Sequence, residues 1–124
     1  MAAMILMWLL TPAKVTWACE ANVPCESVVA IDVGKGRRHL PGGKTETLYV
    51  ASVVVDATKS DLKEVLADCP RDTILIHIEA IALELPKVAI STGGDWFAIE
   101  RATPTEALDA AMSLCPEKVT SHIP

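Results

Sequence analysis

The chain has 124 residues, which is the length of a single domain, and a domain of this size can bury a core of its own. Apolar residues make up 51% of the sequence and aromatic residues only 4%, so aliphatic side chains must fill the interior, which favours a sheet with helices packed on it. The net charge of −5 argues against non-specific binding to nucleic acids or to anionic membranes.

The first 18 residues support two interpretations. Residues 2–10 carry no charge; they are too few to span a bilayer, which takes roughly 20 apolar residues, but they suit the apolar middle of a signal peptide that is cleaved after Ala18. Against cleavage, Lys14 lies in the cleavage region and Trp17 stands next to the proposed cut. Residues 1–18 are therefore either a signal peptide, which makes the protein periplasmic or secreted, or a buried N-terminal strand of a cytoplasmic protein.

The next part of the chain predicts two strands and a helix. Residues 27–33 and 47–57 are rich in β-branched residues, and the second of these segments is apolar on both faces, as in a central strand. The helix begins with an N-cap at Thr58 or Ser60. Its helical spacing predicts an inner face formed by Leu62, Val65, Leu66 and Cys69.

Three further strands are predicted in the second half, over residues 73–85, 88–91 and 96–101. The last two are joined by a tight turn at Gly93 and Gly94, because glycine adopts positive φ at little cost.

A second helix follows these strands. It has a clear start, with Thr103 as N-cap, Pro104 in the first turn and Glu106 closing a capping box. Its predicted inner face consists of Leu108, Ala111, Met112 and Cys115. A short edge strand over residues 118–123 ends the chain.

The predicted order is β-β-α-β-β-β-α, with or without the final edge strand, within one α+β domain over residues 19–124. Short turns between neighbouring strands imply mostly antiparallel pairing. We therefore expect a single sheet of about five strands, with both helices packed on one of its faces.

The four cysteines allow two disulfides. If the helices lie side by side in the same direction, Cys69 and Cys115 at their ends can form one bridge, and Cys19 and Cys25 can close a second, smaller loop. Buried free thiols are the alternative. A metal site is not expected, since there is no C-x-x-C and no His at ligand spacing from a Cys, and no cofactor is predicted.

A basic loop over residues 35–44 is the most distinctive surface feature. Glycines and a proline in residues 34–46 argue against regular structure there. The loop's ending, Gly-Gly-Lys-Thr, lacks the first glycine and the following helix of a phosphate-binding loop. The residues predicted to bind an anionic partner are Lys35, Arg37, Arg38, His39 and Lys44.

Two other segments carry side chains with functional potential. His77 and Glu79 alternate within a predicted strand, so they project from one face and could act as an acid–base pair. Trp96 and Phe97 point to opposite faces, one into the core and the other outward.

These features lead to three hypotheses about function. The first is a small, exported, non-enzymatic protein that binds an unknown protein or anionic partner through the basic loop. The second is a small hydrolase that uses His77 and Glu79. The third is a cytoplasmic nucleic-acid accessory protein that acts through the basic loop.

Overall fold

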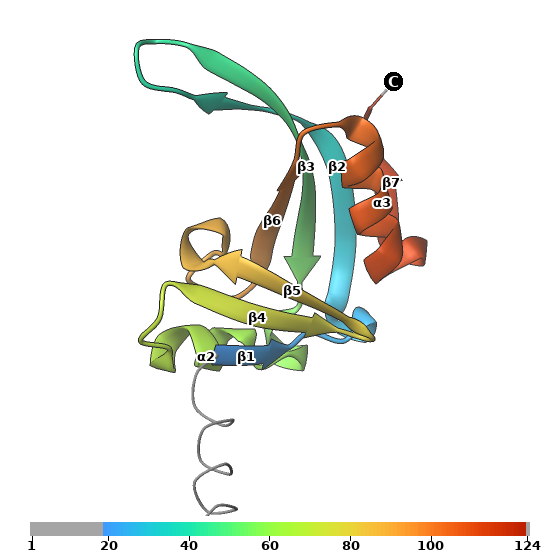
Figure 1. The fold of residues 1–124 in the computed structure, drawn as a ribbon. Helices are drawn as coiled ribbons and strands as arrows, with labels where there is room; N and C mark the ends of the chain where they lie inside the picture. The colour runs from blue at the N-terminus through green and yellow to red at the C-terminus, as the bar shows by residue number, and fades with distance from the viewer. Residues whose placement is uncertain (1–18, 124) are drawn as a thin grey trace, which may run out of the picture.

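The computed structural model describes residues 19–123, so the predicted signal peptide of residues 1–18 lies outside the described residues. Two sheets form the body of the protein (Figure 1). The first contains, in spatial order, β1 (Cys19–Asn22), β4 (Thr73–Ile78) and β5 (Ile81–Pro86). The second contains β6 (Trp96–Arg101), β3 (Thr45–Val55), β2 (Val28–His39) and β7 (Val119–Ser121).

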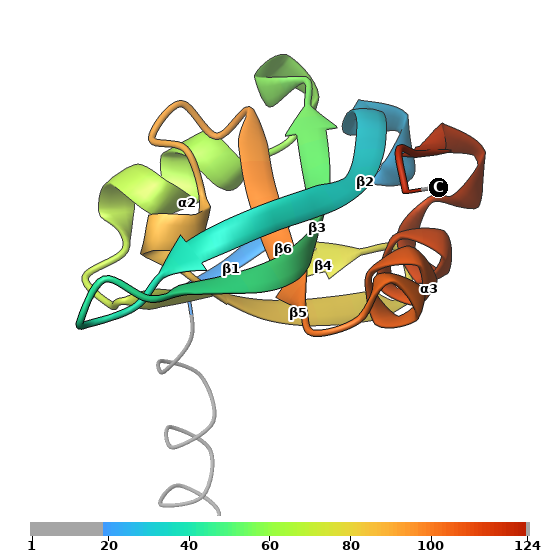
Figure 2. The ribbon, with the colours of Figure 1, turned by 90° about the horizontal axis from the view of Figure 1, so that it is seen from above.

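Two α-helices cover different parts of this body. Helix α3 (Pro104–Leu114) packs against β2, β3 and β6, whereas α2 (Leu62–Asp68) packs against β1 (Figures 1 and 2). The short 3-10 turns are η2 (Cys25–Ser27), η3 (Ala57–Lys59), η4 (Lys87–Ala89) and η5 (Pro116–Lys118).

The predicted α+β class with two helices is confirmed, but the single sheet of about five strands is wrong. The described chain has two mixed sheets, of three and four strands. Each contains one parallel pair, because β1 runs parallel to β4 and β7 runs parallel to β2. The two helices consequently do not share one face of one sheet.

Residues 73–85 form a hairpin rather than the single long strand that we predicted. Strand β4 ends at Ile78, the chain reverses at Glu79 and Ala80, and β5 returns antiparallel to β4. Glu79 takes the positive φ of 52° in this turn, where glycine is the usual signal. Apolar residues occur at alternate positions both before and after Glu79 and Ala80. The sequence pattern therefore looks like one long strand and does not show where the chain reverses.

Residues 88–91 do not form the predicted strand either. They are occupied partly by η4, and only Ile90 forms an isolated bridge, to Phe97. The strand over Trp96–Arg101 and the short edge strand near the C-terminus are confirmed as β6 and β7. Strand β3 lies between β6 and β2 and is therefore central, as expected.

The core is one cluster of buried side chains, contributed by both sheets and by both helices. Phe97 is fully buried, whereas Trp96 is 39% exposed, which confirms that one of these aromatic residues is core and the other is outward. The predicted inner face of α3 is partly wrong, because Leu108 and Met112 are 36% and 47% exposed. The buried residues at the helix and its end are Ala107, Ala111, Leu114 and Cys115.

All four cysteines form disulfides, but the pairing differs from the prediction. Cys19 bonds Cys69, and Cys25 bonds Cys115. The predicted Cys69–Cys115 and Cys19–Cys25 bridges are wrong because α2 and α3 pack on different sheets. The end of each helix meets the N-terminal segment instead of the other helix.

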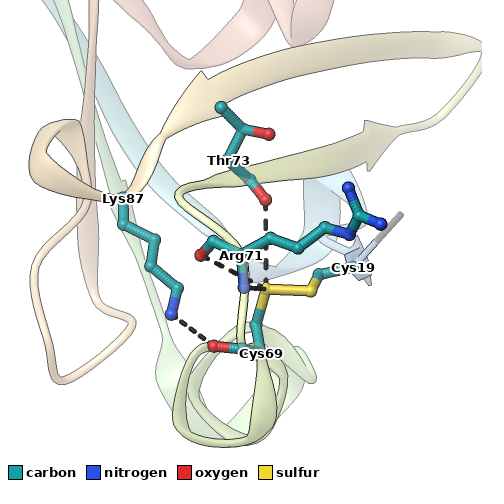
Figure 3. Close-up of a disulfide and its surroundings, with 5 residues drawn as sticks. All are labelled: Cys19, Cys69, Arg71, Thr73 and Lys87. Carbon is teal, nitrogen blue, oxygen red and sulfur yellow. Dashed lines mark hydrogen bonds between the residues drawn. A yellow bond between two sulfur atoms is a disulfide. The ribbon is translucent and has the colours of Figure 1, made fainter. Parts of the chain in front are cut away.

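The Cys19–Cys69 disulfide joins β1 to the end of α2 (Figure 3). The backbone N–H of Arg71 donates to Cys69 Sγ over 3.4 Å, and Lys87 Nζ donates to the carbonyl oxygen of Cys69 (Figure 3). Two disulfides indicate an oxidising, extracytoplasmic location. Over residues 19–123, no helix has the length and apolarity needed to cross a membrane.

Candidate functional site

The predicted basic loop belongs to a two-stranded arm. Strand β7 pairs with β2 only as far as Val33, and β6 pairs with β3 only from Tyr49 onward, so residues 34–48 extend beyond both neighbours. We call residues 34–48 the arm. Its far end bends away from the rest of the described chain (Figure 1).

The arm is regular, in contrast to the irregular loop that we predicted. Its pairing runs from Gly34 opposite Val50 to His39 opposite Thr45. At the tip, Leu40 N–H donates to the carbonyl oxygen of Lys44 over 2.8 Å. The tip itself needs Gly42 and Gly43, which take φ values of 85° and 80°.

Gly36, one of the glycines that argued against a strand, lies within the pairing and faces side chains of β3. A Cβ at Gly36 would lie 3.2 Å from Val50 Cγ2 and 3.3 Å from Leu48 Cδ1. These side chains of β3 occupy the space that a side chain on β2 would need. Leu48 is thereby almost completely buried, although it lies in the arm.

Three of the predicted binding residues lie on one face of the arm. Side chains alternate along a strand, so Lys35, Arg37 and His39 point to the same side. Residues directly opposite in an antiparallel pair share a face, which adds their respective partners Tyr49, Thr47 and Thr45 to this surface. We call Lys35, Arg37 and His39 the basic face. All three are exposed, and within residues 19–123 none of their side chains has an ion-pair or hydrogen-bond partner.

Arg38 points to the opposite face and is engaged there. Its guanidinium lies 3.8 Å from Glu46 Oε2 and donates a hydrogen bond to Glu100 Oε2 of β6. A cleft of about 160 Å³ beside these residues is lined in part by Leu48 and Arg101. Arg38 therefore ties the arm to β6, which leaves it less free to bind a partner than its neighbours.

Lys44 stands apart from both faces. It lies in the tip, immediately before β3, and its side chain is exposed. The five residues of the predicted loop are thus divided among the basic face, the opposite face and the tip.

The predicted acid–base pair required His77 and Glu79 to project from the same face of one strand, and the structure does not have this arrangement. Glu79 lies in the turn after β4, so it does not share a strand face with His77. Glu79 Oε1 accepts a hydrogen bond from Cys25 N–H over 3.0 Å. His77 Nε2 lies 3.8 Å from Glu20 Oε1, on neighbouring β1. Each residue is therefore positioned by a contact to the N-terminal segment.

Sequence reasoning missed a cleft between the edges of the two sheets. It has a volume of about 350 Å³, and β5, η4 and β6 line it. Val88 at this cleft is 94% exposed. We predicted Val88 as part of a strand, and no sequence signal marks the edges of two separate sheets as neighbours.

Asp56 is an ionisable group outside the arm with a role in local structure. The pKa of Asp56 is lowered by a hydrogen bond from the Thr58 hydroxyl, by one from Thr58 N–H and, to a smaller extent, by the charge of Lys59. Asp56 caps η3 through the Thr58 N–H. Within residues 19–123, no group of three or more His, Cys, Asp or Glu side chains is arranged to hold a metal ion.

Comparison with protein-family models, with curated proteins and with solved structures finds no match to this chain.

Proposed function

We propose that the protein is a small, exported binding protein without catalytic activity, and that the basic face of the arm binds an anionic partner. The observation that carries the proposal is the arrangement of Lys35, Arg37 and His39 in a row on a projecting hairpin. No acidic side chain shares this face of the arm, since Glu46 lies on the opposite face with Arg38. A partner can reach the row without displacing an ion pair.

The disulfides support the export part of the proposal. Cys19–Cys69 and Cys25–Cys115 join segments 50 and 90 residues apart, and such bonds persist in the periplasm or outside the cell. The apolar run in residues 2–10 supplies the middle of a signal peptide. We therefore propose a periplasmic or secreted protein.

The charge of the whole chain restricts the partner. With 16 acidic and 11 basic residues, the protein repels a long polyanion over most of its surface. Screening limits this repulsion to roughly 8 Å at physiological salt, so a partner that contacts only the arm avoids it. This favours a local anionic surface or segment over extended nucleic acid.

A binding assay with defined anions tests the proposal. The probes are a glutamate-rich peptide, dextran sulfate, vesicles that contain phosphatidylglycerol, and single-stranded DNA. We expect the protein to bind at least one probe, and we expect the double variant Lys35→Glu/Arg37→Glu to bind it about tenfold or more weakly, because attraction becomes repulsion. Binding should also weaken as salt is added.

The control is the double variant Lys59→Glu/Lys63→Glu, which changes the net charge by the same amount at exposed positions of η3 and α2. We expect it to bind as the natural protein does. Equal weakening in both double variants would show that net charge, and not the basic face, determines binding. Preferred binding of DNA would favour the nucleic-acid hypothesis instead.

A further inference from the structure

We infer that the partner is an extended acidic peptide segment that adds as a strand to the outer edge of β2, along Lys35, Arg37 and His39. This inference rests on the proposed function, since it names the partner of the same basic face. It adds a second mode of recognition, in which backbone hydrogen bonds act together with the charges.

The outer edge of β2 is open along the arm. β7 covers this edge only at Ile31–Val33, and no other strand of residues 19–123 pairs there. His122 N–H donates to the carbonyl oxygen of Val33 over 2.8 Å, so the backbone groups of Val33 point outward, away from β3.

The direction of the backbone groups along the arm follows from this bond. In an antiparallel pair, residues alternate between those whose N–H and C=O point to the partner strand and those whose groups point away. Since Val33 points away from β3, the residues Lys35, Arg37 and His39 also point away. The bond from Leu40 N–H to the Lys44 carbonyl fits the same alternation, because Leu40 points inward.

The free backbone groups and the basic side chains therefore belong to the same three residues. A strand that pairs with this edge places every second side chain opposite Lys35, Arg37 or His39. Acidic residues at alternate positions of the added strand would then lie on the basic face. Along each of the two strands, side chains on the same face follow one another every ~6.6–6.8 Å, which is twice the rise per residue of a strand. The acidic and basic side chains would therefore be spaced alike.

The charges also distinguish the acidic segment from other occupants of the edge. Antiparallel pairing of β2 with β2 of a second copy would bring Lys35 and Arg37 close to like charges, which opposes self-association. The outer edge of β3 in the arm carries Thr45 and Thr47 instead, so it offers no charge to an acidic strand. The β2 edge is consequently the one that selects an acidic partner.

Three synthetic peptides test strand addition. The first alternates glutamate with threonine, the second has the same composition with all glutamates in one block, and the third is the alternating peptide with N-methyl groups on the amides that would face β2. We expect the alternating peptide to bind about tenfold more tightly than either of the others. On binding, Lys35 and Arg37 N–H should gain protection from hydrogen exchange, whereas Gly36 N–H is already paired with β3.

Two protein variants separate charge from backbone. Arg37→Gln removes the charge and keeps the outward N–H, whereas Arg37→Pro removes both, at a position where an edge strand tolerates proline. We expect Arg37→Pro to bind the alternating peptide more weakly than Arg37→Gln. Circular dichroism and the melting temperature check that both variants fold.

The possible outcomes separate this inference from the proposed function. Equal binding of the three peptides, with loss of all binding in Lys35→Glu/Arg37→Glu, would overturn strand addition and retain the charged binding face. Binding that is unchanged in this double variant would overturn both. Dimers that form through β2 and dissociate in Arg37→Pro would show that a second copy occupies the edge, which also overturns the inference.

Discussion

At the scale of single residues, Gly94 is the glycine whose added Cβ would meet the closest neighbouring atoms. Its φ is 69°, and a Cβ added there would lie 2.7 Å from the backbone nitrogen of Lys63 in α2. Both the conformation and the space therefore require glycine. The neighbouring Gly93 does not have a positive φ, and its added Cβ would have nothing nearer than 3.6 Å.

We predict that Gly94→Ala lowers the free energy of unfolding by about 1–3 kcal/mol, through backbone strain and the collision with α2. Gly93→Ala is the matched control and should change stability by less than about 1 kcal/mol. Urea unfolding followed by circular dichroism measures both variants. Equal stability of the two would contradict the close approach of this turn to α2.

The residue types predicted the turn at Gly93 and Gly94, but not which of the two glycines takes the positive φ. The Gly93–Gly94 pair correctly indicated a tight turn, although only Gly94 takes a positive φ. Glu79 shows the opposite case, because it takes a positive φ without being a residue that signals one. The sequence could not show that turn, since the conformation is imposed by the pairing of β4 with β5.

At the scale of elements, the start of α3 was predicted correctly because its signals are local. Thr103 Oγ1 accepts a hydrogen bond from Glu106 N–H over 3.2 Å and donates to Glu106 Oε1 over 2.9 Å. Pro104 occupies the first turn, where its missing N–H costs nothing. A cap of this kind depends on four consecutive residues only.

We predict that Thr103→Ala destabilises the protein by about 1 kcal/mol, because the first turn of α3 loses its cap. Thr105→Ala, in the same turn but without a capping role, should be neutral or slightly stabilising, since alanine favours a helix. Thermal unfolding of the two variants at one protein concentration measures the difference. A larger loss in Thr105→Ala would contradict the cap.

The buried face of α3 was harder to predict because two apolar stripes follow the same helical spacing. The predicted face contained Leu108 and Met112 together with Ala111 and Cys115, because Leu108 and Met112 are larger than Ala107. The structure buries Ala107 and Leu114 together with the predicted Ala111, and it leaves Leu108 and Met112 exposed. Only tertiary packing decides between such stripes. Tertiary contacts also explain Gly36 of the arm, because Val50 and Leu48 of β3 fill the space that a larger side chain would need there.

At the scale of the whole molecule, the disulfides connect the N-terminal segment to both helices. In the chain-entropy model, each bond contributes about 4 kcal/mol by restricting the unfolded chain, and the longer Cys25–Cys115 loop contributes slightly more. We predict that replacing either pair by alanine lowers stability by this order of magnitude. Urea unfolding of each double variant, compared with the natural protein, measures the loss.

A peptide map of the non-reduced protein checks the pairing itself. We expect linked peptides that contain Cys19 with Cys69 and Cys25 with Cys115. A peptide that joins Cys69 to Cys115 would contradict the packing of α2 and α3 on separate sheets.

The sequence predicted the class of the fold and the basic residues of the candidate site, but not the arrangement of either. Helix signals are local, whereas the division into two sheets depends on parallel contacts between distant segments, such as Ala21 opposite Ile76. Likewise, the sequence placed Arg37 and Arg38 together as equivalent cations. Their opposite orientations follow only once β2 is known to continue through them.

The order of the two disulfides along the chain has a consequence for the effect of proteolysis. The bonds interleave, because Cys25 lies inside the loop closed by Cys19 and Cys69, while Cys115 lies outside it. One cut anywhere between residues 19 and 115 therefore leaves two fragments that are still covalently attached. The arm, with its exposed lysines and arginines, can be nicked once without releasing a piece of the protein.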